Sequence, residues 1–254
     1  MLKLMEGSAP KRADDLSTPE HRRLLGLLGF FLPLILIVIV LWRDGWDAWL
    51  RLDSVSAYYY SGAVSAFAGM LVAFALVLFT YRGYRDESGK PAAVDRWCAI
   101  AGALAALGVA LFPTSAPEGF PALDWVTPAV VVTHFISALV LFGIFAVFCL
   151  WLFRKKSKEG GGKPDADKEG RNAVYFVCGL VIVACIVWAF YERWNDRSIF
   201  WPESVALMFF AISWLVKGYA DTPWVRGTSR MSYRLLSPFM LQAGAADDES
   251  HSNR

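Results

Sequence analysis

Six long apolar stretches, almost free of charged residues, restrict the fold of this chain more than any other feature. The clearest covers residues 24–42 (LLGLLGFFLPLILIVIVLW) and contains no charged side chain. About 20 helical residues cross the hydrocarbon core of a bilayer, and within lipid the backbone must satisfy its own hydrogen bonds. The sequence therefore predicts an all-α polytopic membrane protein, a six-transmembrane-helix bundle. Its spans are expected at about 24–42, 60–81, 97–112, 126–153, 173–191 and 199–216.

The distribution of basic residues predicts the orientation of these helices. Of the 25 Lys and Arg residues, all but four lie before the first span, after the last, or in the second and fourth links. The exceptions are Arg43, Arg51, Arg193 and Arg197. Links rich in Lys and Arg stay on the cytoplasmic side, so both termini are expected there. Residues 1–23 then form a cytoplasmic segment, residues 24–218 the membrane domain, and residues 219–254 a cytoplasmic tail that is partly disordered.

Polar side chains gather near the outer ends of three of the expected spans. They are Ser54, Ser56, Tyr59, Thr133, His134 and Glu203. Because the topology places them at one depth, we interpret them as ligand-binding residues of a polar cavity that faces the outer leaflet. A second interpretation applies to residues 54–60, whose three tyrosines are also typical of anchors at a membrane interface.

His134 and Glu203 are the ionisable members of this set, and each has two interpretations. His134 is the only histidine in any expected span, and an ionisable group at that depth faces the bundle interior with a partner. It either has a functional role or, as a neutral ring, hydrogen-bonds a neighbouring helix. Glu203 follows Pro202 in a first helical turn, where it either caps the helix or pairs with His134 or a ligand headgroup.

The sequence lacks the signature motifs of several functional classes. There is no GxxxxGK[ST] loop, no dinucleotide-binding fingerprint, and no HExxH or GxSxG motif. One intramembrane histidine cannot build a three-histidine zinc site, and no span carries a ladder of arginines. We therefore expect no metal and no cofactor. A net charge of only +2 also argues against nucleic acid as a partner.

Four segments of the chain resemble a known group of proteins. They are SVSAYYYSGAVSAFAG, ALGVALFPTS, THFISALVLF and WPESVALMFFAISWLVKG. In these segments, and over about residues 24–218, the chain resembles a group of uncharacterised bacterial six-helix membrane proteins. That group is distantly similar to the damage-regulated autophagy modulator family, which carries a Pro-x-Ile-Ser motif before its second span. Asp53 and Val55 replace the Pro and the Ile here, while Ser56 matches the Ser.

The resemblance implies six spans and a place in the bacterial inner (plasma) membrane, but no established reaction. Our leading hypothesis is a protein without enzymatic activity that binds a lipid or small amphiphile in the outer cavity. The first alternative is an intramembrane hydrolase or transferase acting on lipid headgroups, with Ser56 as nucleophile, His134 as base and Glu203 as orienting acid. The second is a small-solute transporter or channel. Membrane lipids are the expected partners, and a homo-oligomer is left open.

Overall fold

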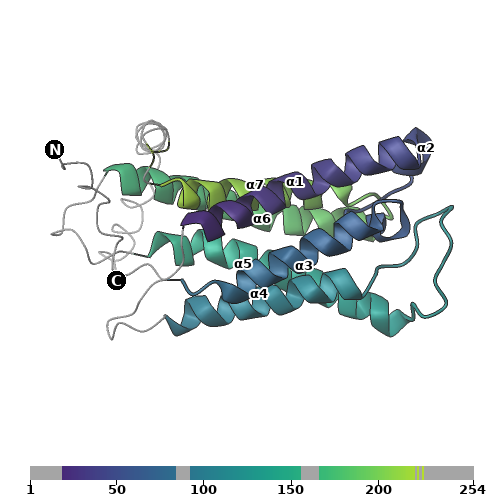
Figure 1. Cartoon of the computed structure of the whole chain (residues 1–254), viewed down its shortest axis with the longest axis horizontal. Coiled ribbons are helices and arrows are strands. Elements are labelled where there is room, and N and C mark those ends of the chain that lie inside the picture. Colours follow the sequence, from purple (N-terminus) through teal and green to yellow (C-terminus); the bar gives the residue numbers. More distant parts are fainter. Residues whose placement is uncertain (1–18, 84–91, 156–165, 221, 223–224, 226–254) are drawn as a thin grey trace, which may run out of the picture.

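The computed structural model describes residues 19–83, 92–155, 166–220, 222 and 225, and this part of the chain is helical without any β-strand. Figure 1 shows its helices lying lengthwise beside one another. Six are long: α1 (Pro19–Arg43), α3 (Val64–Thr80), α4 (Ala93–Leu111), α5 (Pro128–Leu150), α6 (Ala166–Trp194) and α7 (Phe200–Gly218). Three are short: α2 (Trp46–Leu50) and the 3₁₀ helices η1 (Ser56–Tyr60) and η2 (Leu152–Arg154).

The long helices form a closed ring in the order α1, α3, α4, α5, α6, α7, and α7 contacts α1 again. Neighbours in the ring run antiparallel, so α1 begins and α7 ends at the same end of the bundle, which we call the terminal end (Figure 1). The opposite end, called the loop end, consists of residues 44–63, 112–127 and 195–199. Contact between α1 and α3 is the least extensive in the ring, and α5 also touches α7 across its centre.

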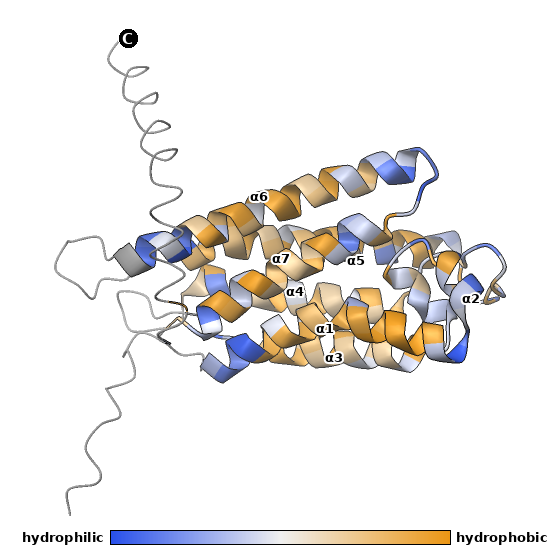
Figure 2. Cartoon of the chain, turned by 90° about the horizontal axis from the view of Figure 1, so that it is seen from above, coloured by the Kyte–Doolittle hydropathy of each residue, from blue (hydrophilic) through white to orange (hydrophobic). Residues whose placement is uncertain are grey.

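Five of the long helices are long and apolar enough to cross a membrane, which agrees with the predicted all-helical membrane protein. The remaining one, α3, is apolar but has only 17 residues. Figure 2 shows hydrophobic residues along the middle of the bundle and hydrophilic residues at its two ends. Large apolar side chains project outward from every long helix, among them Val38, Leu76, Leu104, Ile136, Phe190 and Trp201.

Each of the six expected spans falls on one of the six long helices, but the first and last residues of the helices differ from those expected. The second expected span, 60–81, begins four residues before α3 because residues 56–60 form η1 and Ser61 then breaks the helical path. Helices α1 and α6 are longer than the apolar runs that predicted them, since their first turns are built from polar residues. Residues 1–18 and 226–254, which make up most of the two expected cytoplasmic ends, lie outside the described residues.

Glycines bring the first and last long helices into close contact. A Cβ atom on Gly26 of α1 would lie 2.7 Å from Cγ of Leu215 in α7, and one on Gly29 would lie 3.1 Å from the Phe210 ring. Near the terminal end, a Cβ on Gly218 would lie 2.9 Å from the backbone nitrogen of Arg23. Small residues of this kind allow helix backbones to approach in lipid, where no hydrophobic effect drives association.

Candidate functional site

At the loop end, Glu203 attaches the first loop of the chain to the start of α7. The backbone N–H of Val55 donates a hydrogen bond of 2.7 Å to Oε2 of Glu203. Beside it, the backbone N–H of Ile199 and the hydroxyl of Ser198 both donate to the carbonyl of Asp53, at 2.7 and 2.9 Å. The Glu203 carboxylate thus accepts from a loop that lies almost 150 positions earlier in the sequence, and it joins that loop to the first turn of α7.

Ser54 and Ser56 are both buried and belong to the same segment. The Ser54 hydroxyl accepts the backbone N–H of Ala57 at 3.0 Å and donates to a carboxylate oxygen of Asp53 at 3.3 Å. Together with Glu203, Ser54 therefore satisfies N–H groups at the start of η1 that have no partner within that short helix. Ser56, its first residue, is 6% exposed.

The three consecutive tyrosines of η1 attach it to three different elements. A 3₁₀ helix has three residues per turn, so adjacent side chains point in different directions. Tyr58 is fully buried against Phe200 of α7, with ring centroids 6.0 Å apart. Tyr59 meets Phe67 of α3 edge to face at 6.5 Å, and the Tyr60 hydroxyl donates to the carbonyl of Thr114 at 2.6 Å. Burial raises the pKa of Tyr58 to about 12.

His134 holds the end of α4 rather than the η1 segment. It is 2% exposed, and its Nδ1 lies 2.6 Å from the carbonyl oxygen of Phe112, the C-cap residue directly after α4. A carbonyl can only accept, so Nδ1 carries the hydrogen and donates it. The neighbouring Thr133 is exposed and donates to the carbonyl of Ala129 on its own helix, at 2.8 Å. His134 thereby satisfies one of the carbonyls that every helix leaves free at its last turn.

The expected site residues therefore divide into two groups. Ser54, Ser56 and Glu203 meet around the backbone of Val55, and Tyr59 lies on the same short helix. His134 is bonded to α4, and within the described residues no hydrogen bond joins it to Ser56 or Glu203. Catalysis with Ser56 as nucleophile, His134 as base and Glu203 as acid would need hydrogen bonds of roughly 2.6–3.2 Å between these side chains.

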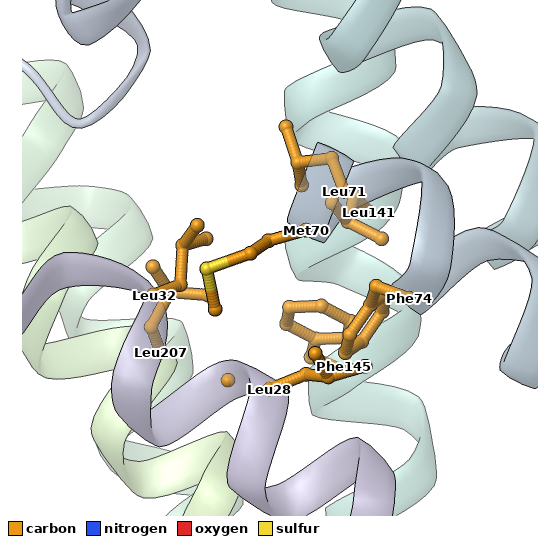
Figure 3. Close-up of a pocket in the computed structure, with 9 residues that line it drawn as sticks. Leu28, Leu32, Met70, Leu71, Phe74, Leu141, Phe145 and Leu207 are labelled. Carbon is orange, nitrogen blue, oxygen red and sulfur yellow. The ribbon is translucent and has the colours of Figure 1, made fainter. Parts of the chain in front are cut away.

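An apolar pocket, which the polar residues did not predict, lies at mid-height in the bundle. It is lined by Leu28, Gly29, Leu32, Met70, Leu71, Phe74, Leu141, Phe145 and Leu207, and holds about 280 Å³ of empty space including its open side. Figure 3 shows Met70 extending from α3 toward Leu32 and Leu207, across the space between α3, α1 and α7. Leu28 and Met70 are the partly exposed members of the lining, so the pocket opens between α1 and α3, where the ring contact is least extensive.

The terminal end contains an ion pair that the sequence did not predict, between a buried carboxylate and a partly exposed ammonium group. Asp95, in the first turn of α4, is 1% exposed, and its Oδ1 lies 2.5 Å from Nζ of Lys155, just after η2. Gly83 packs on this carboxylate with a φ of +67°, and a Cβ there would lie 2.6 Å from the Asp95 Cβ. The acidic residue at a helix start was visible in the sequence, but its partner, 60 positions away, depends on the packing of α4 beside α5.

The described residues contain no group of three or more His, Cys, Asp or Glu side chains that could hold a metal ion. No family model matches this chain. Searches of curated proteins and of solved structures likewise found no match. The resemblance to six-helix bacterial membrane proteins therefore stays a prediction from the sequence, and the geometry described above carries the argument about function.

Proposed function

We propose that this protein is a six-span membrane protein without enzymatic activity that holds one acyl chain of a lipid or small amphiphile in the pocket between α1 and α3. The observation that carries this proposal is the composition and position of the pocket. Every lining side chain is apolar, and the opening lies halfway along the helices, where lipid tails surround a bundle of this kind. Met70 suits such a ligand because its unbranched, flexible thioether adapts to the shape of a chain.

The enclosed part of the pocket is small, about 20 Å³, and the 280 Å³ of empty space is mostly its open side. An acyl chain would therefore lie along the opening and enter the bundle only as the flexible Met70 side chain moves aside. The remainder of the ligand would lie outside, between α1, α3 and the bilayer. This places the ligand away from the polar cluster of the loop end, whose hydrogen bonds go to the protein backbone.

In this proposal all six long helices cross the membrane, with the terminal end in the cytoplasm. The 17 residues of α3 lie at the short end of the range for a span, about 17–25, and η1 precedes the helix at the interface. The orientation is supported by basic residues, since only Arg51 and Arg197 lie in the loop end and only Arg43 and Arg193 in the helix turns next to it. The resemblance to bacterial six-helix proteins would make this the inner membrane.

A hydrolase acting through Ser56, His134 and Glu203 has less support, because the hydrogen bonds of His134 and Glu203 go to backbone groups of Phe112 and Val55. Serine needs an adjacent base to act as a nucleophile. A channel is not favoured either, since the lining of the central pocket is apolar.

A photoreactive phospholipid tests the pocket. With a diazirine on its acyl chain, the lipid is expected to label the peptides that contain Leu28 and Met70. Leu28→Trp would close the opening and reduce that labelling several-fold. Leu27→Trp is the matched control, because Leu27 is adjacent on α1 but 40% exposed on the outer face. Equal labelling in the two variants, or labelling spread evenly over all helices, would disprove the pocket as a lipid site.

Orientation is tested separately with a membrane-impermeant maleimide on intact cells. Glu118→Cys, exposed at the loop end, should be labelled from outside, whereas Glu169→Cys near the start of α6 should react only after permeabilisation. The reverse pattern would overturn the proposed topology.

A further inference from the structure

A proline inside α1 leaves one carbonyl of that helix without its regular hydrogen bond. The helix continues from Pro19 to Arg43 through Pro33, which is buried. Proline has no backbone N–H, so it cannot donate to the carbonyl four residues earlier, and its ring crowds that carbonyl. The residue four positions before Pro33 is Gly29. The Gly29 carbonyl therefore lacks the hydrogen bond that a carbonyl inside an α-helix normally accepts.

Gly29 also belongs to the lining of the apolar pocket between α1 and α3. A glycine has no side chain, so the atoms that it presents to the pocket are backbone atoms. A Cβ atom at this position would lie 3.1 Å from the Phe210 ring, which leaves little room for a side chain that would cover the backbone. The carbonyl without its regular partner thus belongs to the lining residue that can offer its backbone to a ligand.

The other side chains of the lining cannot replace the missing donor. In membrane helices, a carbonyl freed by proline is usually satisfied by a neighbouring helix, a Ser or Thr hydroxyl, or a water. The lining side chains all come from Leu, Met and Phe, which have no donor group (Figure 3). An acceptor in apolar surroundings costs free energy when it has no donor. A ligand that brings a donor would therefore gain a hydrogen bond that the protein itself does not supply from this lining.

The enclosed part of the pocket fits one small polar group. Its volume of about 20 Å³ is enough for one water molecule, but a buried water makes about three hydrogen bonds. Here a water would find only the Gly29 carbonyl and the sulfur of Met70, which is a weak acceptor. A hydroxyl group on a hydrocarbon chain needs one acceptor for its proton, and its carbon atoms can pack on the leucines. The pocket therefore suits a hydroxyl-bearing chain better than a water.

The depth of Gly29 indicates where on the chain this hydroxyl lies. At 1.5 Å per residue, Gly29 is about 15 Å from the start of α1 and about 21 Å from its end. The hydrocarbon core of a bilayer is about 30 Å thick, so in the proposed arrangement Gly29 lies close to its middle. Headgroups do not reach this depth. The hydroxyl must therefore be carried on the distal half of an acyl chain.

We propose that the Gly29 carbonyl determines the specificity of the apolar pocket, and that the ligand is a lipid with a hydroxyl group on the distal half of one acyl chain. The hydroxyl donates to the Gly29 carbonyl, while the rest of the chain packs on the leucines and on Met70. This inference rests on the proposed function, because it names the chemical class of the lipid that the pocket holds.

Competition against the diazirine lipid tests this specificity on the full-length protein in nanodiscs. Three phosphatidylcholines serve as competitors, and they differ only in one stearoyl chain, which carries a hydroxyl group past its middle, a keto group at the same carbon, or no substituent. The keto group matches the hydroxyl in size but can only accept a hydrogen bond. The hydroxyl lipid is expected to displace the diazirine lipid at a concentration about three- to tenfold lower than the other two, which is the usual effect of one neutral hydrogen bond.

Two proline variants show whether the Gly29 carbonyl is responsible. Pro33→Ala supplies the N–H that pairs with this carbonyl, so the ratio between the hydroxyl and keto lipids should fall to about one, even if the affinity for all chains changes. Pro128→Ala is the matched control, because Pro128 is exposed at the first residue of α5, where no preceding helical turn offers a carbonyl, and it should keep the wild-type ratio.

The outcomes separate this inference from the proposed function. No labelling of the peptides with Leu28 and Met70 would contradict the proposed function itself. Labelling that the hydroxyl and keto lipids displace equally in the wild type would contradict only the hydroxyl specificity. A wild-type ratio in Pro33→Ala would also overturn the role of the Gly29 carbonyl. The wild-type comparison needs no substitution, so it decides the question even if Pro33→Ala does not fold.

Discussion

The two ends of the bundle use polar residues in different ways. At the loop end, Glu203 and His134 bond to backbone groups, the N–H of Val55 and the carbonyl of Phe112. At the terminal end, Asp95 bonds to another side chain, Lys155, and two arginines, Arg22 and Arg171, are buried. Polar side chains at the loop end therefore satisfy backbone groups, whereas the terminal end contains charged side chains that are buried in the bundle.

This difference has a physical origin in the connections. The loop end contains irregular backbone between helices, and buried N–H and C=O groups need partners wherever a helix stops. Polar side chains at that end are accounted for by this need. Asp95 at the terminal end is instead paired with the ammonium group of Lys155, so its partner is a charged side chain rather than a backbone group. A polar cluster in a membrane protein is therefore better evidence for a ligand when its partners are not backbone.

The largest effect is expected from breaking the ion pair of the terminal end. Lys155→Met would leave the buried Asp95 carboxylate unpaired and lower the free energy of unfolding by about 3 kcal/mol. Denaturation of the purified protein in mixed micelles measures it. The double variant Asp95→Asn with Lys155→Met should regain most of this loss, and the exposed Arg154→Met should change little. A loss as small as that of a surface pair, below ~1 kcal/mol, would contradict the burial of the pair.

A smaller effect is expected at the loop end from Glu203→Ala. The substitution leaves the Val55 N–H without its acceptor, which costs about 2 kcal/mol. Hydrogen exchange at the Val55 amide should become faster, while the terminal end is unaffected. Glu203→Gln keeps an acceptor oxygen and should retain most of the protection. If Glu203→Gln were as damaging as Glu203→Ala, the negative charge rather than the hydrogen bond would be essential, and the two ends would resemble each other.

His134→Phe is expected to cost about 1 kcal/mol, because the ring volume is kept and only the bond to the Phe112 carbonyl is lost. The measurement is again the free energy of unfolding in micelles. Photolabelling of the apolar pocket by the diazirine lipid should not change in this variant. A loss of lipid labelling would link His134 to the ligand and would restore the polar residues of the loop end as part of the binding site.

The smallest effect at neutral pH, essentially none, is expected from Tyr58→Phe. Burial raises the pKa of Tyr58 to about 12, so the folded state keeps its proton between about pH 10 and 12 while the unfolded chain loses it. The wild type should therefore lose stability as pH rises through this window, by about 1 kcal/mol at pH 11. Tyr58→Phe should lose less between pH 9 and 11. Identical pH profiles would show that Tyr58 is not buried.

The sequence predicted the helical membrane character and the polar residues worth following, because hydropathy and depth are local properties. It left open whether His134 bonds a neighbouring helix, and its bond to the end of α4 is of that kind. The partner of Glu203 was not foreseen, since Val55 lies 148 positions away and meets it only because α7 packs beside α1.

The apolar pocket between α1 and α3 and the Asp95–Lys155 pair were missed for the same reason. Both depend on the order of helices in the ring, which apolar runs alone do not specify. The close approach of Gly26 to Leu215 was also hidden, because glycines in an apolar run indicate that a helix can approach a neighbour closely but not which neighbour it is.

The contact between α1 and α7 also constrains how the protein is made. Of the six long helices, α1 leaves the ribosome first, yet its buried face, with Gly26 and Gly29, packs on α7, which leaves it last of the six. During translation that face meets lipid or other helices until α7 is inserted. The ring can close only after the whole membrane domain has been produced, so a chain that stops before Phe200 leaves the bundle open along α1. Such a product would present its glycine-lined face to the quality-control proteases of the membrane.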